Sequence, residues 1–370
     1  MSSPENKWPD HMAPPEKIFI DQEVESSSLA LKITDKLPDI PVEILLPDQE
    51  ISQMSAPSDS LILYLKHYRG KFLRSCPGTS NYRCCSYKII HIGENCPLNC
   101  SYCILQAYFQ DRVLKVWANQ DDLWTELDQA FSRDKEKLFR VGTGEFTDSL
   151  ALDHLTQYSS SLISFLSNYP NVCLELKSKV INLSWMHKAS CPSQVLPAWS
   201  VNSPDIIARE EKGASSLEER LDAARTCARN GSRVCLHFDP IIHYPNWEKG
   251  YKKCVEMIFD YLKPESIAYV SLGSFRFMPW LKKIIMNNHP QSTYIYNEFI
   301  TGLDGKTRLL MPLRLEQFKF IANNLKRGGI SRQLYFCMES DTVWKEVLGY
   351  TPKDIGGLGN HLNNLTFGSD

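Results

Sequence analysis

The chain has 370 residues, and its 41 Lys and Arg against 43 Asp and Glu give a formal net charge of −2. This balance excludes a protein that binds nucleic acid through a globally basic surface, although a local basic face is compatible with it. No run of about 18 apolar residues is present, so the sequence predicts no transmembrane helix and no membrane partner. The opening Met1–Lys7 has no apolar core of a secretory signal, and we therefore expect a cytoplasmic protein.

The N-terminal part predicts a tail followed by a small α/β extension. Residues 1–16 are rich in Pro, Glu, Asp and Lys without periodicity, which is typical of a disordered tail. Residues 17–84 are expected to form the extension, with strand-like runs at 17–20 and 41–46 and a helix near 28–37.

Residues 85–290 show the alternation of strands and helices that is typical of a parallel sheet. β-branched or aromatic runs recur at residues 87–91, 138–141, 173–176, 196–201, 233–238 and 267–272. Helical periodicity lies between them, for example over 152–166 and in a helix that begins with the capping box Ser216-Leu-Glu-Glu219. The predicted fold class is therefore α/β: an incomplete (β/α)6 TIM-like barrel with α+β extensions at both ends.

Polar residues follow the strand-like runs of this barrel. They are Gly142-Thr-Gly-Glu145, Lys177, Ser200, Asn202, Asp239 and Ser274. Because the carboxyl ends of parallel strands meet at one face, where such barrels carry their active sites, we expect these residues to lie at the functional site.

After residue 290 the pattern changes to that of a small appended element. Strand-like runs at 294–300 and 307–310 flank Gly302-Leu-Asp-Gly305, which indicates a hairpin turn. A helix over 315–326 and a strand over 334–338 are expected next. Residues 291–370 are therefore predicted to form a C-terminal hairpin and helix element.

Six of the twelve cysteines fall within one short segment: Cys76, Cys84, Cys85, Cys96, Cys100 and Cys103. In a reducing compartment, clustered cysteines indicate metal ligands rather than disulfides. The last three have the spacing C-x3-C-x2-C, and three thiolates on one loop are able to bind three irons of a cubane cluster and leave the fourth iron without a protein ligand. The alternative is a zinc site completed by Cys84 or Cys85.

The segment Asn95–Gln106 resembles the radical S-adenosylmethionine (SAM) enzymes, whose signature is C-x3-C-x-aromatic-C, with Tyr102 at the aromatic position. The resemblance implies that Cys96, Cys100 and Cys103 hold a [4Fe-4S] cluster and that SAM chelates its open iron. One electron then cleaves SAM to a 5′-deoxyadenosyl radical, which abstracts a hydrogen atom from the substrate, while the protein orients the cofactors and excludes solvent.

The same resemblance implies a set of SAM-binding residues. The glycine-rich Gly142-Thr-Gly-Glu145 is similar to the motif that receives the SAM amine, in which Gly142 and Gly144 permit close backbone approach and Glu145 supplies a carboxylate. Further residues expected to bind the cofactor are Thr147, Asp148, Lys177 (facing the SAM carboxylate), Ser200 and Asn202 (facing the ribose), and Tyr102. The alternatives are an ordinary strand-to-helix turn for the glycines and common loop residues for the others.

Several further motifs resemble the spore photoproduct lyase family. They are Cys103-Ile-Leu-Gln106, Thr147-Asp148, Asp153-His-Leu-Thr156, Asp239-Pro-Ile-Ile242, Trp247-Glu-Lys-Gly-Tyr251, Lys17-Ile-Phe-Ile20 and Pro41-Val-Glu43. The resemblance implies a radical SAM carbon–carbon lyase that repairs a thymine photoproduct in DNA. It also implies an electron donor such as flavodoxin or ferredoxin as partner.

Two positions depart from that family. Glu145 stands where the lyases carry the cysteine that returns a hydrogen atom to the product radical, and Ile104 replaces the second of two tyrosines that flank the last cluster cysteine. A carboxyl group is no substitute for a thiol because its O–H bond is too strong. We therefore expect Tyr102 and Glu145 at the catalytic site, with Glu145 as the SAM-amine contact, and we leave Cys84, Cys85 and Cys337 as candidate hydrogen donors.

Other roles remain open for the remaining cysteines and for the basic residues. Cys76, Cys84 and Cys85 are candidate ligands of a second cluster, which would raise the iron content above that of one cubane. The C-terminal part carries basic residues that are candidates for DNA phosphate contacts or for a solvated helix face: Lys306, Arg308, Arg314, Lys319, Lys326, Arg327 and Arg332. The alternative functions are a radical SAM enzyme with a non-DNA substrate and a non-catalytic, metal-stabilised nucleic-acid-binding protein.

Overall fold

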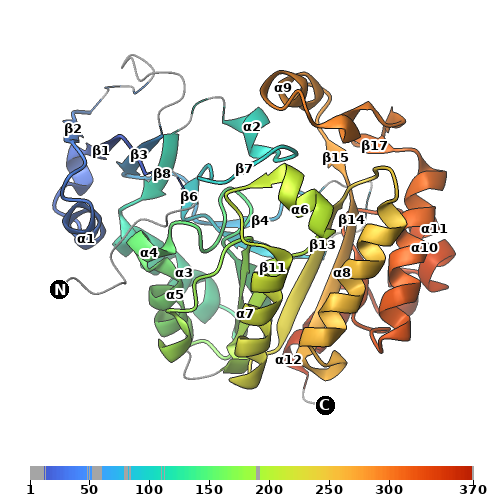
Figure 1. The fold of residues 1–370 in the computed structure, drawn as a ribbon. Helices are drawn as coiled ribbons and strands as arrows, with labels where there is room; N and C mark the ends of the chain where they lie inside the picture. Colours follow the sequence, from blue (N-terminus) through green and yellow to red (C-terminus); the bar gives the residue numbers. More distant parts are fainter. Residues whose placement is uncertain are drawn as a thin grey trace.

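The computed structural model describes residues 12, 14–47, 49, 51, 61–78, 82, 85–109, 111, 113–188 and 192–368. Two sheets dominate the fold (Figure 1), a large central sheet and a smaller N-terminal sheet beside it. Most of the expected N-terminal tail and Cys84 lie outside the described residues. Among the helices of the described residues, none combines the length and apolarity needed to cross a bilayer.

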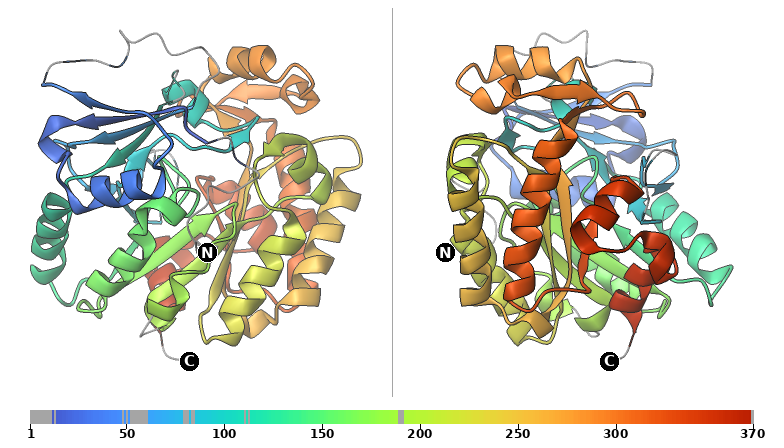
Figure 2. Two further views of the ribbon diagram at one scale, coloured as in Figure 1. Left: turned by 60° about the vertical axis from the view of Figure 1, so that its left-hand side comes forward. Right: turned by 90° about the vertical axis from the view of Figure 1, so that its right-hand side faces the viewer.

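The central sheet curls into a half barrel, which Figure 2 shows from two sides. Every neighbouring pair is parallel except β4–β5, and the order along the sheet is β18-β14-β13-β11-β10-β9-β5-β4. The strands are β4 (Leu73–Ser75), β5 (Lys88–Ile90), β9 (Phe139–Gly142), β10 (Val172–Ser178), β11 (Val195–Ser200), β13 (Val234–Ile241), β14 (Ile267–Ser274) and β18 (Leu334–Phe336). All six predicted barrel strands are therefore present, and β18 adds a further parallel strand.

Helices cover the outer face of the central sheet (Figure 2). They are α5 (Tyr158–Leu166), α7 (Leu217–Arg229), α8 (Trp247–Tyr261), α10 (Met311–Arg327), α11 (Asp341–Leu348) and α12 (Leu358–Phe367). Helices α5, α7 and α12 contact strands of the sheet, α8 packs against α7 and α10, and α11 packs against α10. The predicted capping box of α7 is confirmed, because Ser216 and Glu219 each accept the other's backbone N–H. The helix expected over 152–166 is divided into α4 (Asp153–Thr156) and α5, because Gln157 has a left-handed φ of 52°.

The N-terminal sheet mixes strands from both sides of the expected boundary at residue 84. Its order is β2-β1-β3-β8-β6, and α1 (Ser28–Lys36) accompanies it. The strands are β1 (Lys17–Asp21), β2 (Val42–Leu45), β3 (Ile62–Lys66), β6 (Gly93–Glu94) and β8 (Val113–Trp117). Conversely, β4 belongs to the central sheet. Strand pairing crosses the boundary because ladder hydrogen bonds join segments that are distant in sequence.

The C-terminal part is likewise not a separate element, because its strand β18 belongs to the central sheet. Its other two strands lie in a small sheet of three strands. β16 (Phe299–Thr301) and β17 (Thr307–Leu309) form the expected hairpin, and β15 (Arg276–Phe277) adds a third strand. The strand expected over 294–300 begins as a 3-10 helix, Thr293–Tyr296, and becomes strand β16 only at Phe299. Helix α10 starts four residues earlier than predicted, with Pro312 in its first turn.

Candidate active site

A cavity of about 310 Å³ lies at the carboxyl ends of the central strands. Its floor and walls come from alternate residues of the strands, because side chains two apart point to the same face of a sheet. These residues are Glu175, Lys177 and Lys179 from β10 and its end, His237 and Asp239 from β13, Tyr269 and Ser271 from β14, and Tyr335 and Cys337 from β18 and its end. The loop that follows β9 adds Gly144, Glu145 and Phe146. This is the face at which the sequence predicted the site.

The cysteine loop closes one side of this cavity, where Tyr102, Cys103 and Ile104 line it. Strand β7 (Asn99–Cys100) pairs antiparallel with β12 (Glu211–Lys212), which holds the loop against the segment after α6 (Pro204–Glu210). Gln106 donates hydrogen bonds from Nε2 to the carbonyl oxygens of Cys100, Ser101 and Cys103. The loop is therefore fixed by long-range pairing and by one amide side chain.

Of the three motif cysteines, Cys100 is buried and Cys96 and Cys103 are half-buried, and their thiols lie within electrostatic reach of one another. Burial raises the pKa of Cys96, Cys100 and Cys103. For Cys100 and Cys103, the positive charge of Lys179 acts in the opposite direction. Among the described residues no three His, Cys, Asp or Glu side chains converge on one metal ion. A cubane does not require such convergence, because each cysteine binds a different iron, and three thiols on one partly buried loop beside a cation fit that group.

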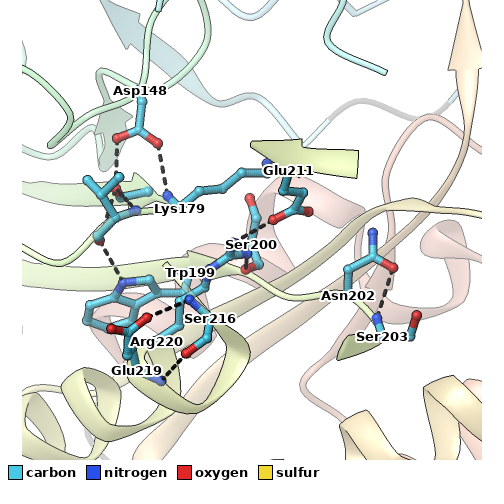
Figure 3. A network of polar contacts seen from close by, with 12 residues as sticks. Asp148, Lys179, Trp199, Ser200, Asn202, Ser203, Glu211, Ser216, Glu219 and Arg220 are labelled. Atoms are coloured by element: carbon cyan, nitrogen blue, oxygen red, sulfur yellow. Dashed lines mark hydrogen bonds and ion pairs between the residues drawn. The ribbon is translucent and has the colours of Figure 1, made fainter. Parts of the chain in front are cut away.

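A buried ion pair, Arg220–Glu211, contacts the cysteine loop through Tyr102, and Figure 3 shows the two charged residues. Arg220 pairs with Glu211 at 2.5 Å and donates a second hydrogen bond to the carbonyl oxygen of Ser200 at 2.9 Å. Glu211 also accepts the hydroxyl hydrogen of Tyr102. Both charged side chains are at most 1% exposed. Tyr102 is thus held by a carboxylate that is itself neutralised by Arg220, and the Lys179 ammonium lies over its ring.

Glu145 and Lys177 face the same cavity as Cys103. Burial alone would lower the pKa of Lys177, but the carboxylates of Glu145 and Glu175 outweigh it and the pKa is raised. Lys177 is therefore an ammonium next to a carboxylate. The Lys177 ammonium is suited to bind the carboxylate of a zwitterionic ligand, such as the methionine part of SAM, and the Glu145 carboxylate is suited to bind its ammonium.

The two glycines of the predicted motif are required by close packing within the protein. A Cβ at Gly142 would lie 1.8 Å from the Tyr87 hydroxyl, and a Cβ at Gly144 would lie 2.9 Å from the carbonyl oxygen of Lys177. Gly144 lines the cavity, whereas Gly142 lies beneath it at the end of β9. Gly142 thus stays only a predicted cofactor contact.

Thr147 and Asp148 lie at the end of the same loop and away from the cavity wall. The Asp148 carboxylate accepts hydrogen bonds from the backbone N–H of Lys179 at 2.9 Å and from the Ser178 hydroxyl at 2.7 Å. These hydrogen bonds connect the loop after β9 to the end of β10, which indicates that Asp148 positions the backbone at Lys179. The Asp148 carboxylate is thus already hydrogen-bonded within the protein.

Ser200 and Asn202 are not brought to this cavity. The Asn202 side chain donates to the carbonyl oxygen of Pro240 at 2.9 Å and accepts from the Tyr251 hydroxyl at 2.7 Å and from the backbone N–H of Ser203 at 3.0 Å. Asn202 is 1% exposed. Its amide is satisfied inside the protein, so the structure does not support the expected ribose contact.

The buried polar group at the cavity floor is a site feature that sequence reasoning missed. Glu175 accepts hydrogen bonds from the hydroxyls of Tyr87 and Tyr269, and its Oε1 lies 3.6 Å from His237 Nε2. Burial would raise the Glu175 pKa, but His237 and the other partners lower it to about 2. The sequence signal was the alternation of polar residues along β10, β13 and β14, which an apolar buried strand would not show.

Three of the seven candidate DNA-binding residues are paired with carboxylates of the protein. Arg308 pairs with Asp304 at 2.5 Å, Arg314 pairs with Glu339 at 3.1 Å, and both arginines are buried. Lys319 pairs with Glu346 at 3.1 Å. The buried pairs leave Arg308 and Arg314 little access to a phosphate, whereas Lys319 stays a candidate because its pair is exposed. Lys306 lines the cavity instead.

The comparisons with known proteins agree with this geometry. A family model described as spore photoproduct lyase matches residues 22–302. The spore photoproduct lyase of Geobacillus sp. (strain Y412MC61) is 22% identical over 285 residues, which cover 75% of this chain and 83% of the relative. That of Bacillus subtilis (strain 168) is 23% identical over 207 residues, or 55% and 60% of the two chains.

Solved structures show the same fold. A spore photoproduct lyase complexed with dinucleoside spore photoproduct matches with a TM-score of 0.75 at 19% identity, over 88% of this chain and 99% of that chain. A mutant of the lyase in which one cysteine is replaced by alanine matches with the same TM-score, also at 19% identity, over 88% and 100%. Since the family model spans residues 22–302, which is well over half of the sequence, this chain belongs to the spore photoproduct lyase family.

Proposed function

We propose that this protein is a radical SAM enzyme that repairs a thymine photoproduct in DNA. The observation that carries the proposal is one cavity that is lined by Cys103 of the three-cysteine loop, by the oppositely charged Glu145 and Lys177, and by Lys306 of the C-terminal hairpin. Relatives named spore photoproduct lyase and a family structure complexed with dinucleoside spore photoproduct support the choice of substrate.

The residues that would hold the cofactors are those that surround the cysteine loop. Cys96, Cys100 and Cys103 would bind the [4Fe-4S] cluster, while Glu145 and Lys177 would bind the two charged ends of the methionine part of SAM. When bound, the cluster and SAM supply a 5′-deoxyadenosyl radical that abstracts a hydrogen atom. An electron donor such as flavodoxin or ferredoxin is expected to reduce the cluster.

The chain's own residues orient these groups and exclude water. Gln106 and the β7–β12 pairing hold the cysteine loop, and Asp148 fixes the backbone at Lys179. Phe146, Phe275 and Phe277 supply apolar wall to the cavity. Exclusion of water matters because a carbon radical abstracts hydrogen atoms from any nearby C–H or S–H bond. The enclosing side chains therefore determine which bond is within reach of the radical.

The C-terminal hairpin is suited to a substrate that enters from outside. Leu303 at its tip is 85% exposed, and Lys306, directly before β17, lines the cavity. The Lys306 ammonium lies 4.0 Å from the Met338 sulfur, and burial lowers the Lys306 pKa. An apolar tip next to a cation is suited to a nucleotide, which presents a flat base and a phosphate.

The test of the proposed function is an anaerobic assay of reconstituted protein with SAM, a reductant and ultraviolet-irradiated spore-type DNA. Release of 5′-deoxyadenosine together with loss of the photoproduct is the expected result. Cleavage of SAM without any effect on the DNA would favour a non-DNA substrate. Zinc in place of iron, with no SAM cleavage, would favour a metal-stabilised binding protein.

Removing the charges that face the cofactor should weaken SAM binding. We expect Glu145→Ala and Lys177→Met each to raise the dissociation constant of SAM about 10- to 100-fold, because a hydrogen bond to a charged group contributes about 1.5–3 kcal/mol. Titration calorimetry on the iron-loaded protein measures this directly. The matched control is Glu256→Ala, since Glu256 is exposed on α8 and pairs with Lys252 on the same helix. Unchanged affinity in both cavity variants would contradict the assignment.

Lys306→Ala should weaken DNA binding evenly across sequences. A lost phosphate contact lowers the slope of log K against log salt concentration by about 1. Binding of duplex DNA at several salt concentrations gives this slope. Lys252→Ala serves as control because Lys252 on α8 is not among the candidate residues and pairs with Glu256, and it should leave the slope unchanged. A flat salt response of the unmodified protein would argue against any phosphate contact.

A further inference from the structure

The thiol of Cys337, which follows β18, lies in the same cavity as Glu145. Glu145 stands in the loop after β9, at the position where the lyases carry their hydrogen-donor cysteine. Cys337 directly follows β18, and with Tyr335 it points to the cavity side, as residues two apart on a strand do. Its backbone N–H donates to the carbonyl oxygen of Leu272 at 3.0 Å. The sequence did not place Cys337, because β18 reaches this position only by pairing with β14.

The Cys337 sulfur is held among the charged groups of the cavity wall. The Arg276 Nη2 lies 3.3 Å from the sulfur, and the same guanidinium pairs with Asp239 at 3.3 Å. Glu145 and Lys177 are within electrostatic reach of the thiol. The sulfur therefore faces the groups that the proposed function assigns to SAM, and not the apolar core.

The same wall carries a second group that indicates a ligand. His237 is 6% exposed and lines the cavity. Its Nδ1 lies 2.7 Å from the Ser271 hydroxyl, whereas its Nε2 has only a 3.6 Å contact with Glu175 Oε1 and makes no hydrogen bond among the described residues. Buried polar groups are normally satisfied, so an unsatisfied one in a cavity wall indicates a polar ligand that completes it. Asp239 lies within electrostatic reach of both His237 and Cys337, which places the thiol and this open position in one region.

On the basis of the proposed function, we propose that Cys337 is the hydrogen-atom donor that converts the product radical into the repaired product. The thiol S–H bond breaks, and its hydrogen atom forms a C–H bond at the product carbon radical, which leaves a thiyl radical on Cys337. One electron from the donor that reduces the cluster, and one proton from solvent, return the thiyl to the thiol. The atoms and electrons of the step therefore balance.

The chemistry of the cavity favours Cys337 for this role. Only a protonated thiol has a hydrogen atom to give. Burial raises the pKa of Cys337 to about 11, against the lowering effect of Arg276, so that the thiol is neutral at physiological pH. The carboxyl group of Glu145 has no comparably weak bond, and Cys103 is assigned to the cluster.

Besides Cys103 of the cysteine loop, two other thiols line the same cavity and serve as the internal comparison. Cys76 and Cys85 come from the segment between β4 and β5, on the opposite edge of the sheet from β18. Variants with Cys76→Ala, Cys85→Ala and Cys337→Ala therefore each remove one cavity thiol and leave the cysteine loop intact.

The experiment is repair of the photoproduct in D2O. Thiol hydrogens exchange with solvent, so the unmodified protein should place one deuterium in the repaired thymine. Cys337→Ala should still bind SAM and release 5′-deoxyadenosine, but its yield of repaired thymine should fall at least about tenfold. The residual product should lack solvent deuterium. Cys337→Ser, which keeps the polarity and most of the volume, should behave like Cys337→Ala.

Other outcomes separate this inference from the proposed function. If Cys337→Ala repairs with unchanged yield and deuterium content, or if Cys76→Ala or Cys85→Ala loses them instead, the assignment of Cys337 is overturned while the repair activity stands. If the unmodified protein releases no 5′-deoxyadenosine, the proposed function itself fails. A visible iron–sulfur absorbance in each variant confirms that the cluster is retained.

Discussion

A Cys100→Ala variant, reconstituted anaerobically with iron and sulfide, should be colourless and should release no 5′-deoxyadenosine. Cys100 ends β7, the strand that pairs with β12, and its thiol is buried next to the other two motif cysteines. With two of three ligands left, one more iron of the cubane lacks a protein ligand, and the cluster is no longer retained. Visible absorbance and iron analysis measure the loss.

The control for this variant is Cys227→Ala, in which a fully buried cysteine of α7 is replaced outside the cavity. It loses a small apolar contact and should keep both colour and SAM cleavage. SAM cleavage by Cys100→Ala at the rate of the unmodified protein would show that the three-cysteine loop does not hold the cluster.

Arg220→Met should lower the free energy of unfolding by about 3–5 kcal/mol, the usual cost of leaving one partner of a buried ion pair uncompensated. Arg220 and Glu211 are both almost completely buried, and Glu211 also accepts from Tyr102 in the cysteine loop. The remaining Glu211 carboxylate then loses its paired guanidinium. Because the loop depends on this carboxylate, the variant should also lose iron faster to a chelator.

The matched control is Arg225→Met on the same helix, whose pair with Asp222 is partly exposed. Exposed pairs contribute at most about 1 kcal/mol, so its unfolding curve should nearly coincide with that of the unmodified protein. Denaturant unfolding of both variants gives the two values. A loss of less than about 1 kcal/mol in Arg220→Met would contradict a supporting role for the buried pair.

The pH dependence of stability should follow from the same pair. Burial would raise the pKa of Glu211, but Arg220 and Lys179 lower it below its ordinary value of 4.5. A carboxylate with a lowered pKa stabilises the folded state fully above its unfolded pKa and ceases to do so as the pH falls through the folded pKa. The stabilisation from Glu211 is therefore present at neutral pH and is lost only on strong acidification.

The sequence alone determined the parts of this protein that depend on local pattern. The hydrophobic runs predicted all six barrel strands, and the capping box predicted the start of α7. The cysteine spacing and the polar residues after the strands pointed to one face of the barrel, and Glu145, Lys177 and Cys103 do line one cavity there. These features were readable because periodicity, caps and turn residues act over a few neighbouring residues.

Only the tertiary structure decided which distant segments meet. It brought β8 into the N-terminal sheet and β18 into the central sheet, and it thereby placed Cys337 in the cavity. It also paired Arg308 and Arg314, which were candidates for phosphate contacts, with carboxylates of the protein. Asn202, which was expected to contact the ribose, instead makes its hydrogen bonds inside the protein. Strand order and charge pairing are set by hydrogen bonds and burial between segments far apart in the chain, and no local pattern records them.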